Sequence, residues 1–229
     1  MNLKVLGSSS SGNCYLIEVN NEKLILDAGV NFKIVQKELN FNFNGIEGVL
    51  ITHEHMDHLK YASNFALYGI NIYASAGTFK KLNLIGHRFK VIKALQQFEI
   101  GNFIILPFDT KHDAVEPLGF LIQYKPTGEK LIYATDTYYI KYKFNKLNYL
   151  LIECNYNKGQ AKDNEISGVI NTTLFLEKAK IIIDRRKLIF SNGEYKNIIV
   201  DLQNVSKIKI INKWHILINY KEIEIDIQQ

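Results

Sequence analysis

Short apolar or alternating runs, separated by polar turns, open the chain. Residues 3–6, 15–19 and 23–26 have the period-two or continuous apolar pattern of strands. A Ser/Gly/Asn-rich turn at residues 7–13 and the pair Asn20-Asn21 separate them. The pattern predicts a hairpin-rich edge of a sheet.

In the next stretch, segments whose apolar residues have helical spacing alternate with a continuous apolar run typical of a buried strand. Three apolar residues at helical spacing predict a short amphipathic helix over residues 32–39. Residues 48–51 form a continuous apolar run that predicts a buried strand, and residues 59–68 predict a second helix. Strands followed by helices are typical of the α/β class.

The second half of the chain continues this pattern and then becomes rich in strands. The change predicts a boundary near Lys178, between a main domain over residues 1–178 and a β-rich C-terminal segment over residues 179–229 with no assigned role. The predicted strands are residues 103–108, 119–124, 130–134, 149–153, 181–183, 187–190, 198–200, 208–211, 215–219 and 223–227, and the predicted helix is residues 172–178.

Length and composition agree with a folded α/β domain. The 229 residues are 47% hydrophobic and 22% charged, which suits one domain with a sizeable core and leaves no room for two full catalytic domains. Lys and Arg number 28 against 23 Asp and Glu, giving a net charge of +5. This balance suits an anionic partner but is far from histone-like.

The start of the chain does not predict secretion. Residues 1–7 reach a polar turn before a signal-peptide apolar region forms, and no later apolar run approaches the roughly 18 residues of a membrane span. We therefore expect a cytoplasmic protein without a membrane partner. Cys14 and Cys154 are too few for a disulfide framework, so we expect reduced thiols in the core.

A histidine-rich motif follows the strand at residues 48–51. His53, His55 and His58 stand with Asp57 within six positions at the end of this strand. Alternate residues of an extended segment point the same way, so His53 and His55 can converge on one metal ion. Asp57 and His58 lie just beyond, where they can face a second ion.

Two further candidate ligands also follow apolar strands. His112 lies in Asp109-Thr110-Lys111-His112-Asp113, and Asp136 lies in Ala134-Thr135-Asp136-Thr137. Each residue alone is typical of a surface or turn position. Together with the histidine-rich motif they indicate a complete metal centre.

The order of these residues resembles the metallo-beta-lactamase fold superfamily. His53-x-His55-x-Asp57-His58 is preceded by Asp27 after a strand and followed by His112 and Asp136. More narrowly, residues 7–14, 135–137 and 153–155 resemble the WalJ/YycJ-type branch with its phage-borne relatives, whose members are regarded as metal-dependent nucleases. The resemblance spans about residues 1–178. It implies a four-layer αββα sandwich with the metals at one edge between the two sheets.

The resemblance also implies a role for each matching residue. Two divalent ions, Zn²⁺ or Mn²⁺, would activate a bridging water as hydroxide and neutralise charge on a phosphoryl or carbonyl oxygen. His53, His55 and His112 would bind one ion, Asp57 and His58 the other, with Asp136 between them and Asp27 behind the ligands as an orienting group. In the Ser-rich turn, Ser11 and Asn13 are candidates for binding a substrate phosphate.

One feature departs from the superfamily pattern. The superfamily usually completes its second metal site with a late histidine, and here no histidine falls between His112 and His215. Gly168-Val169 stands about where that histidine would be. We interpret His215 as structural, and the open alternatives for the second site are Asp163, Glu165 or His215 itself.

These features predict a metal-dependent hydrolase, most specifically a phosphodiesterase or nuclease acting on DNA or RNA, in which Asp57 is catalytic. A hydrolase of thioesters or lactones on the same fold is one alternative. The other is a degenerate relative that keeps one metal and binds nucleic acid or a protein partner. The sequence does not indicate an oligomeric state.

Overall fold

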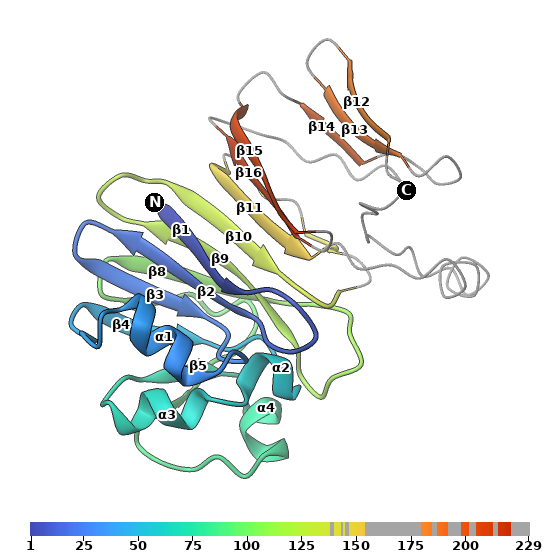
Figure 1. Ribbon diagram of the computed structural model, residues 1–229. Coiled ribbons are helices and arrows are strands. Elements are labelled where there is room, and N and C mark those ends of the chain that lie inside the picture. The colour runs from blue at the N-terminus through green and yellow to red at the C-terminus, as the bar shows by residue number, and fades with distance from the viewer. Residues whose placement is uncertain are drawn as a thin grey trace. The chain divides into compact units, whose positions relative to one another are not determined.

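The computed structural model divides into two compact units (Figure 1). The first contains Met1–Asp109 and Asp113–Gly128, and the second contains Thr110–His112 and Glu129–Gln229. The structure describes residues 1–137, 140–142, 144, 147–153, 180–184, 187–191, 198–201, 205–212 and 215–220.

A six-stranded sheet is the centre of the first unit. Its strands lie in the order β1-β2-β3-β4-β5-β6; β1 to β3 pair antiparallel, and β3 pairs in parallel with β4, which is followed by β5 and β6 in the same direction. The antiparallel part confirms the predicted hairpin-rich edge. The strands are β1 (Asn2–Gly7), β2 (Cys14–Val19), β3 (Glu22–Leu26), β4 (Ile46–Leu50), β5 (Ile72–Ala74) and β6 (Phe89–Val91).

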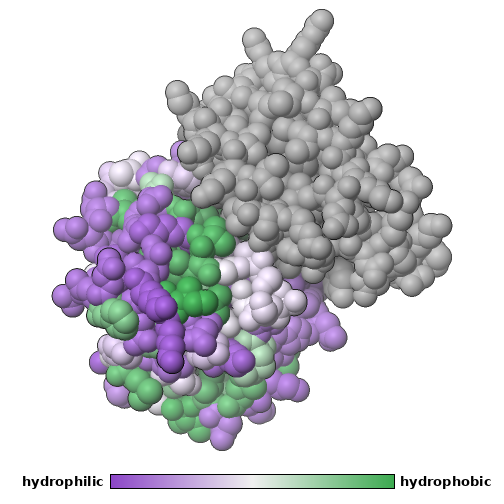
Figure 2. Space-filling model, in the orientation of Figure 1, coloured by the Kyte–Doolittle hydropathy of each residue, from purple (hydrophilic) through white to green (hydrophobic). Residues whose placement is uncertain are grey.

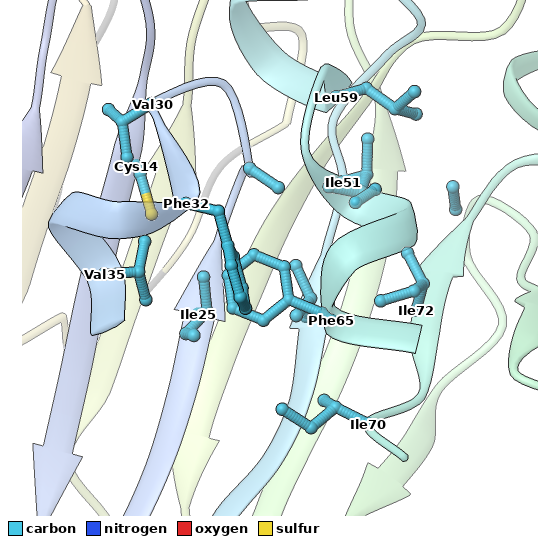
Figure 3. Close-up of a cluster of buried hydrophobic side chains, with 14 of the residues drawn as sticks. Cys14, Ile25, Val30, Phe32, Val35, Ile51, Leu59, Phe65, Ile70 and Ile72 are labelled. Carbon is cyan, nitrogen blue, oxygen red and sulfur yellow. The ribbon is translucent and has the colours of Figure 1, made fainter. Parts of the chain in front are cut away.

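Short helices cover one face of this sheet and build the core. Side chains from helices and strands pack in one buried cluster, part of which is drawn in Figure 3. Phe32 and Phe65 meet edge to face there, with ring centroids 5.0 Å apart. The helices are α1 (Phe32–Glu38), α2 (Met56–Leu59), α3 (Ala62–Leu67) and α4 (Ala76–Lys81).

The helix predicted over residues 59–68 was wrong in its extent. The chain instead forms α2 and α3, which are interrupted at Lys60 and Tyr61. The backbone of Ala28 explains the break, because its N–H donates to the His58 carbonyl at 2.6 Å and its carbonyl accepts from the Tyr61 N–H at 2.8 Å. A pairing with a distant loop thus replaces the helical hydrogen bonds at this point.

Three antiparallel strands form the other sheet of the first unit. They are β7 (Phe98–Ile100), β8 (Phe103–Asp109) and β9 (Leu118–Tyr124). The Tyr73 and Phe98 rings stack at 5.4 Å, and the Tyr124 hydroxyl donates to Glu22 Oε2 at 2.7 Å. The six-stranded sheet therefore has helices on one face and a second sheet on the other, as an αββα order requires.

Strands also make up the described part of the second unit. Here β10 pairs in parallel with β11, which pairs with β16, and β16 pairs with β15, while β12, β13 and β14 form a separate antiparallel sheet. These strands are β10 (Lys130–Ala134), β11 (Tyr149–Glu153), β12 (Lys180–Asp184), β13 (Lys187–Ser191), β14 (Ile198–Asp201), β15 (Val205–Asn212) and β16 (His215–Tyr220).

The boundary near Lys178 stays a prediction. The predicted helix over residues 172–178 and the predicted strand over residues 223–227 lie outside the described residues.

The visible face of the first unit is largely hydrophilic, with smaller apolar areas between (Figure 2). Leu67 and Ile85 are the most exposed of its large apolar side chains, at 84% and 83%. Within the described part of the chain, no helix is both long enough and apolar enough to cross a membrane.

Candidate metal centre

The ends of two parallel strands place the first residues of the site. Leu26 of β3 and Leu50 of β4 are register partners, so the segments that follow them leave the sheet side by side. Asp27 continues this pairing, since its N–H donates to the Leu50 carbonyl at 2.8 Å. Its φ of +56° then turns the chain, a conformation that Asp tolerates better than most residues.

Asp27 is a buried carboxylate with several donors around it. It accepts from the Thr52 N–H at 2.8 Å and from the Thr52 hydroxyl at 3.0 Å. Its Oδ2 also lies 2.7 Å from His58 Nδ1. The imidazole therefore carries a proton on Nδ1 and presents the lone pair of Nε2 away from Asp27. The role of Asp27 as an orienting group behind metal ligands stays a prediction.

Thr52 orients His53 in the same manner. The single Thr52 hydroxyl proton goes to Asp27, so the hydroxyl oxygen accepts from His53 Nδ1, 3.0 Å away. His53 then presents the lone pair of Nε2, which lies 3.1 Å from His55 Nδ1. The spacing of alternate residues has brought these two rings together, as the sequence predicted.

Asp57 and Asn13 stand on the far side of His58. The His58 Nε2 atom lies 3.5 Å from Asp57 Oδ2 and 3.1 Å from Asn13 Nδ2. The Asp57 side chain is 29% exposed, so it is open to solvent, whereas Asn13 is buried. Ser11 stays on the exposed part of the turn and shares a 2.7 Å hydrogen bond with Ser9. The substrate-binding roles of Ser11 and Asn13 stay predictions.

The other two predicted ligands belong to the second unit. His112 follows β8, and Asp136 follows β10 with a φ of +48°. A hydrogen bond of 3.1 Å from the Lys111 N–H to Thr137 Oγ1 joins their two loops. Their participation in one site with the histidines of the first unit stays a prediction.

The alternative donors for the second site gain no support. Asp163 and Glu165 lie outside the described residues. His215 is the first residue of β16 and the register partner of Glu153. Its structural interpretation stays a prediction.

Sequence reasoning missed Thr52 and Glu54. Glu54 is buried, and its Oε1 accepts from the Val115 N–H at 2.8 Å. The Leu118 N–H donates to the Thr52 carbonyl at 2.9 Å. These two hydrogen bonds hold the segment that follows His112 against the histidine-rich motif. The only sequence signal was that both residues are polar and follow a buried strand.

Cys14 is a core residue, as predicted. It is fully buried and free of disulfide bonding. Burial raises the pKa of its thiol far above the usual range, and the charge of Asp27 acts in the same direction. The thiol is therefore inert as a nucleophile. Cys154 lies outside the described residues.

The donor set fits a divalent transition-metal ion. Two imidazoles present oriented lone pairs, each held by a hydrogen bond from its other nitrogen, which is the usual arrangement behind metal-binding histidines. A partly exposed carboxylate stands beside them, and the buried Oδ1 of Asn13 has no hydrogen-bond partner among the residues that the structure describes. An oxygen buried in this way is unusual unless an ion or water satisfies it.

Comparison with known proteins identifies the family. The model of the beta-lactamase superfamily domain matches residues 22–166. The chain belongs to this superfamily. Membership confirms the α/β fold with two sheets that was expected and supports a metal-dependent hydrolase.

Two curated relatives lie in the expected branch of the superfamily. Exodeoxyribonuclease YycJ of Bacillus anthracis is 31% identical over 152 residues, covering 61% of this chain and 56% of the relative. Exodeoxyribonuclease WalJ of Streptococcus pneumoniae is 31% identical over 147 residues, covering 59% and 54%. The chain thus spans about half the length of the curated relatives it matches.

Solved structures of the superfamily are also similar. MEM-A1, a subclass B3 metallo-beta-lactamase from a soil metagenome library, aligns with a TM-score of 0.49 and 16% identity, over 58% of this chain and 60% of that one. The metallo-beta-lactamase fold protein YhfI of Bacillus subtilis aligns with a TM-score of 0.47 and 18% identity, over 59% and 61%.

Proposed function

We propose that this chain is a metal-dependent phosphodiesterase that cleaves DNA or RNA. The observation that carries the proposal is the arrangement of His53 Nε2, 3.1 Å from His55 Nδ1, next to a His58 that Asp27 orients. The two relatives are named as exodeoxyribonucleases, which supports nucleic acid as the substrate. The net charge of +5 agrees with an anionic substrate.

In this proposal the ligands divide between two ions, which are Zn²⁺ or Mn²⁺. Mixed imidazole and carboxylate donors suit both metals. His53, His55 and His112 would hold one ion, and Asp57 and His58 would hold the second, with Asp136 between them.

The side chains of the first unit have separate tasks in such a reaction. Divalent ions bound at these residues would supply an activated water and would neutralise charge on the phosphate. Asp57, which is 29% exposed beside His58, would accept a hydrogen bond from the attacking water and so orient it. Asp27 and Thr52 keep the imidazoles in fixed tautomers and positions. The exposed hydroxyl of Ser11 can donate to a phosphate oxygen of the substrate.

A substrate panel tests the proposal. The protein, freed of metal and reloaded with Mn²⁺ or Zn²⁺, is incubated with labelled single- and double-stranded DNA, RNA, a thioester and a lactone. We expect cleavage of a nucleic acid that a chelator stops. Asp57→Asn should reduce the rate by about 100-fold or more. Glu99→Gln, at an exposed carboxylate of β7, should leave the rate unchanged.

Other outcomes would replace the proposal. Turnover of the thioester or the lactone without cleavage of nucleic acid would assign the other hydrolase activity. Tight binding of one ion without turnover of any substrate would favour the degenerate, non-enzymatic relative.

A further inference from the structure

A carboxamide lies where the second metal site is short of a ligand. We propose that Asn13 binds the second ion through its side-chain oxygen, in place of the late histidine that this sequence lacks between His112 and His215. The inference rests on the proposed function in one respect, the presence of a second ion.

Three side-chain atoms form a small triangle at this point. Asn13 Nδ2 is 3.1 Å from His58 Nε2, His58 Nε2 is 3.5 Å from Asp57 Oδ2, and Asp57 Oδ2 is 3.5 Å from Asn13 Nδ2. Ligand atoms at about 2.1 Å from one ion, in tetrahedral to octahedral geometry, are separated by about 3.0 to 3.5 Å. The triangle therefore has the dimensions of one face of a coordination shell.

The tautomer of His58 decides which end of the carboxamide faces the ion. Because Asp27 holds the proton on Nδ1, the Nε2 lone pair is the acceptor for Asn13 Nδ2 in the absence of metal. When that lone pair binds an ion, Nδ2 keeps only the 3.5 Å contact with Asp57. A half-turn of the carboxamide exchanges its ends and presents the oxygen instead. That oxygen otherwise lies buried without a hydrogen-bond partner in the described part of the chain.

The backbone fixes Asn13 at this position. Its N–H donates to the Asp57 carbonyl at 2.7 Å, and its carbonyl accepts from the Gly29 N–H at 2.9 Å. The residue is only 3% exposed, so its side chain is directed into the site and away from an outside ligand. A donor on this rigid loop needs no movement of the rest of the chain to reach the ion.

An amide oxygen also changes the metal preference of the site. Amide and carboxylate oxygens favour harder ions such as Mn²⁺, whereas imidazole favours Zn²⁺. With Asn13 in place of a histidine, the ratio of Mn²⁺ to Zn²⁺ affinity should be higher at the Asp57 and His58 site than at the His53 and His55 site.

Binding of Mn²⁺ to metal-free protein, counted by the electron paramagnetic resonance of the free ion, tests the inference. Wild type should bind two equivalents. Asn13→Ala should weaken the second equivalent by about tenfold or more and leave the first unchanged. Asn13→Asp, which retains an oxygen at the same place, should keep both. Ser8→Ala, which removes a buried hydrogen bond to Tyr15 in the same turn, is the matched control and should also keep both.

Two results would overturn the inference. One is wild-type binding of both ions by Asn13→Ala. The other is an Asn13→Asp variant that folds and loses the second ion, because this would show that the amide N–H matters and the oxygen does not. Asn13→Asp also decides the question if Asn13→Ala does not fold. If the second ion depends on Asn13 but no nucleic acid is cleaved, the ligand assignment stands and the nuclease proposal fails.

Discussion

The Asp27 carboxylate and the His58 imidazole form a buried pair, with Oδ2 2.7 Å from Nδ1 and side chains 0% and 1% exposed. A buried carboxylate is costly unless donors surround it, and Thr52 supplies two more hydrogen bonds to Asp27. The pair therefore combines stability with orientation, since it sets the direction of the His58 lone pair.

Asp27→Asn should weaken metal binding while leaving the backbone in place. Asn tolerates the φ of +56° as well as Asp does, but its neutral amide is a poorer acceptor for the Nδ1–H of His58. We expect a loss of about 10- to 100-fold in affinity for the ion that His58 binds, measured by titration calorimetry on metal-free protein. Unchanged affinity would mean that Asp27 serves the fold alone.

The double variant His53→Ala with His55→Ala should lose bound metal. His53 Nε2 lies 3.1 Å from His55 Nδ1, and the two rings meet edge to face with their centroids 4.7 Å apart. Elemental analysis of purified wild type and variant checks this, with a chelator-treated wild type as the reference for background. Equal metal content in variant and wild type would contradict the metal centre.

Glu54→Ala should loosen the chain that follows His112. It removes the carboxylate acceptor of the partly buried hydrogen bond from the Val115 N–H, which should cost about 1 kcal/mol in the free energy of unfolding. It should also lower metal affinity, because the loop carrying His112 loses an anchor. Glu54→Gln keeps an acceptor oxygen and should restore most of the metal affinity. If both variants bind metal as wild type does, Glu54 has no positioning role.

Gly29→Ala should disturb the site through sterics alone. A Cβ at Gly29 would overlap the carbonyl group of Asp57, so we expect a loss of about 3 kcal/mol in the free energy of unfolding. Gly128→Ala is the matched control, because its Cβ meets nothing within 4 Å and only its φ of +70° opposes alanine, at about 1 kcal/mol. Thermal or denaturant unfolding compares the two. A larger loss for Gly128→Ala would contradict the close approach of Gly29 and Asp57.

The sequence predicted the parts of the site that depend on local geometry. His53 and His55 converge because alternate residues of an extended segment share a face. Asp27 was expected from the resemblance alone, and it reaches the motif because β3 and β4 are parallel neighbours. The apolar runs likewise fell on the strands of the first sheet, apart from β5 and β6, which have three residues each and are too short to show a period.

Contacts between distant segments were not predictable in this way. The break between α2 and α3 depends on the backbone of Ala28, which no helical pattern reveals. Glu54 resembles any polar residue of the motif until Val115 is found beside it. Asn13 was expected to bind a substrate phosphate, which stays a prediction, and its backbone pairing with Gly29 and Asp57, which no local pattern reveals, brings it beside His58.

Metal content and phosphodiester turnover, measured on one preparation, test the central claim most directly. Metal-free protein is titrated with Mn²⁺ or Zn²⁺ while cleavage of labelled DNA and RNA is followed at each step, for wild type and for Asp57→Asn. We expect cleavage to appear as ions bind, to disappear with a chelator and to fall by about 100-fold or more in Asp57→Asn. Protein that binds its full complement of ions and cleaves neither DNA nor RNA would contradict it.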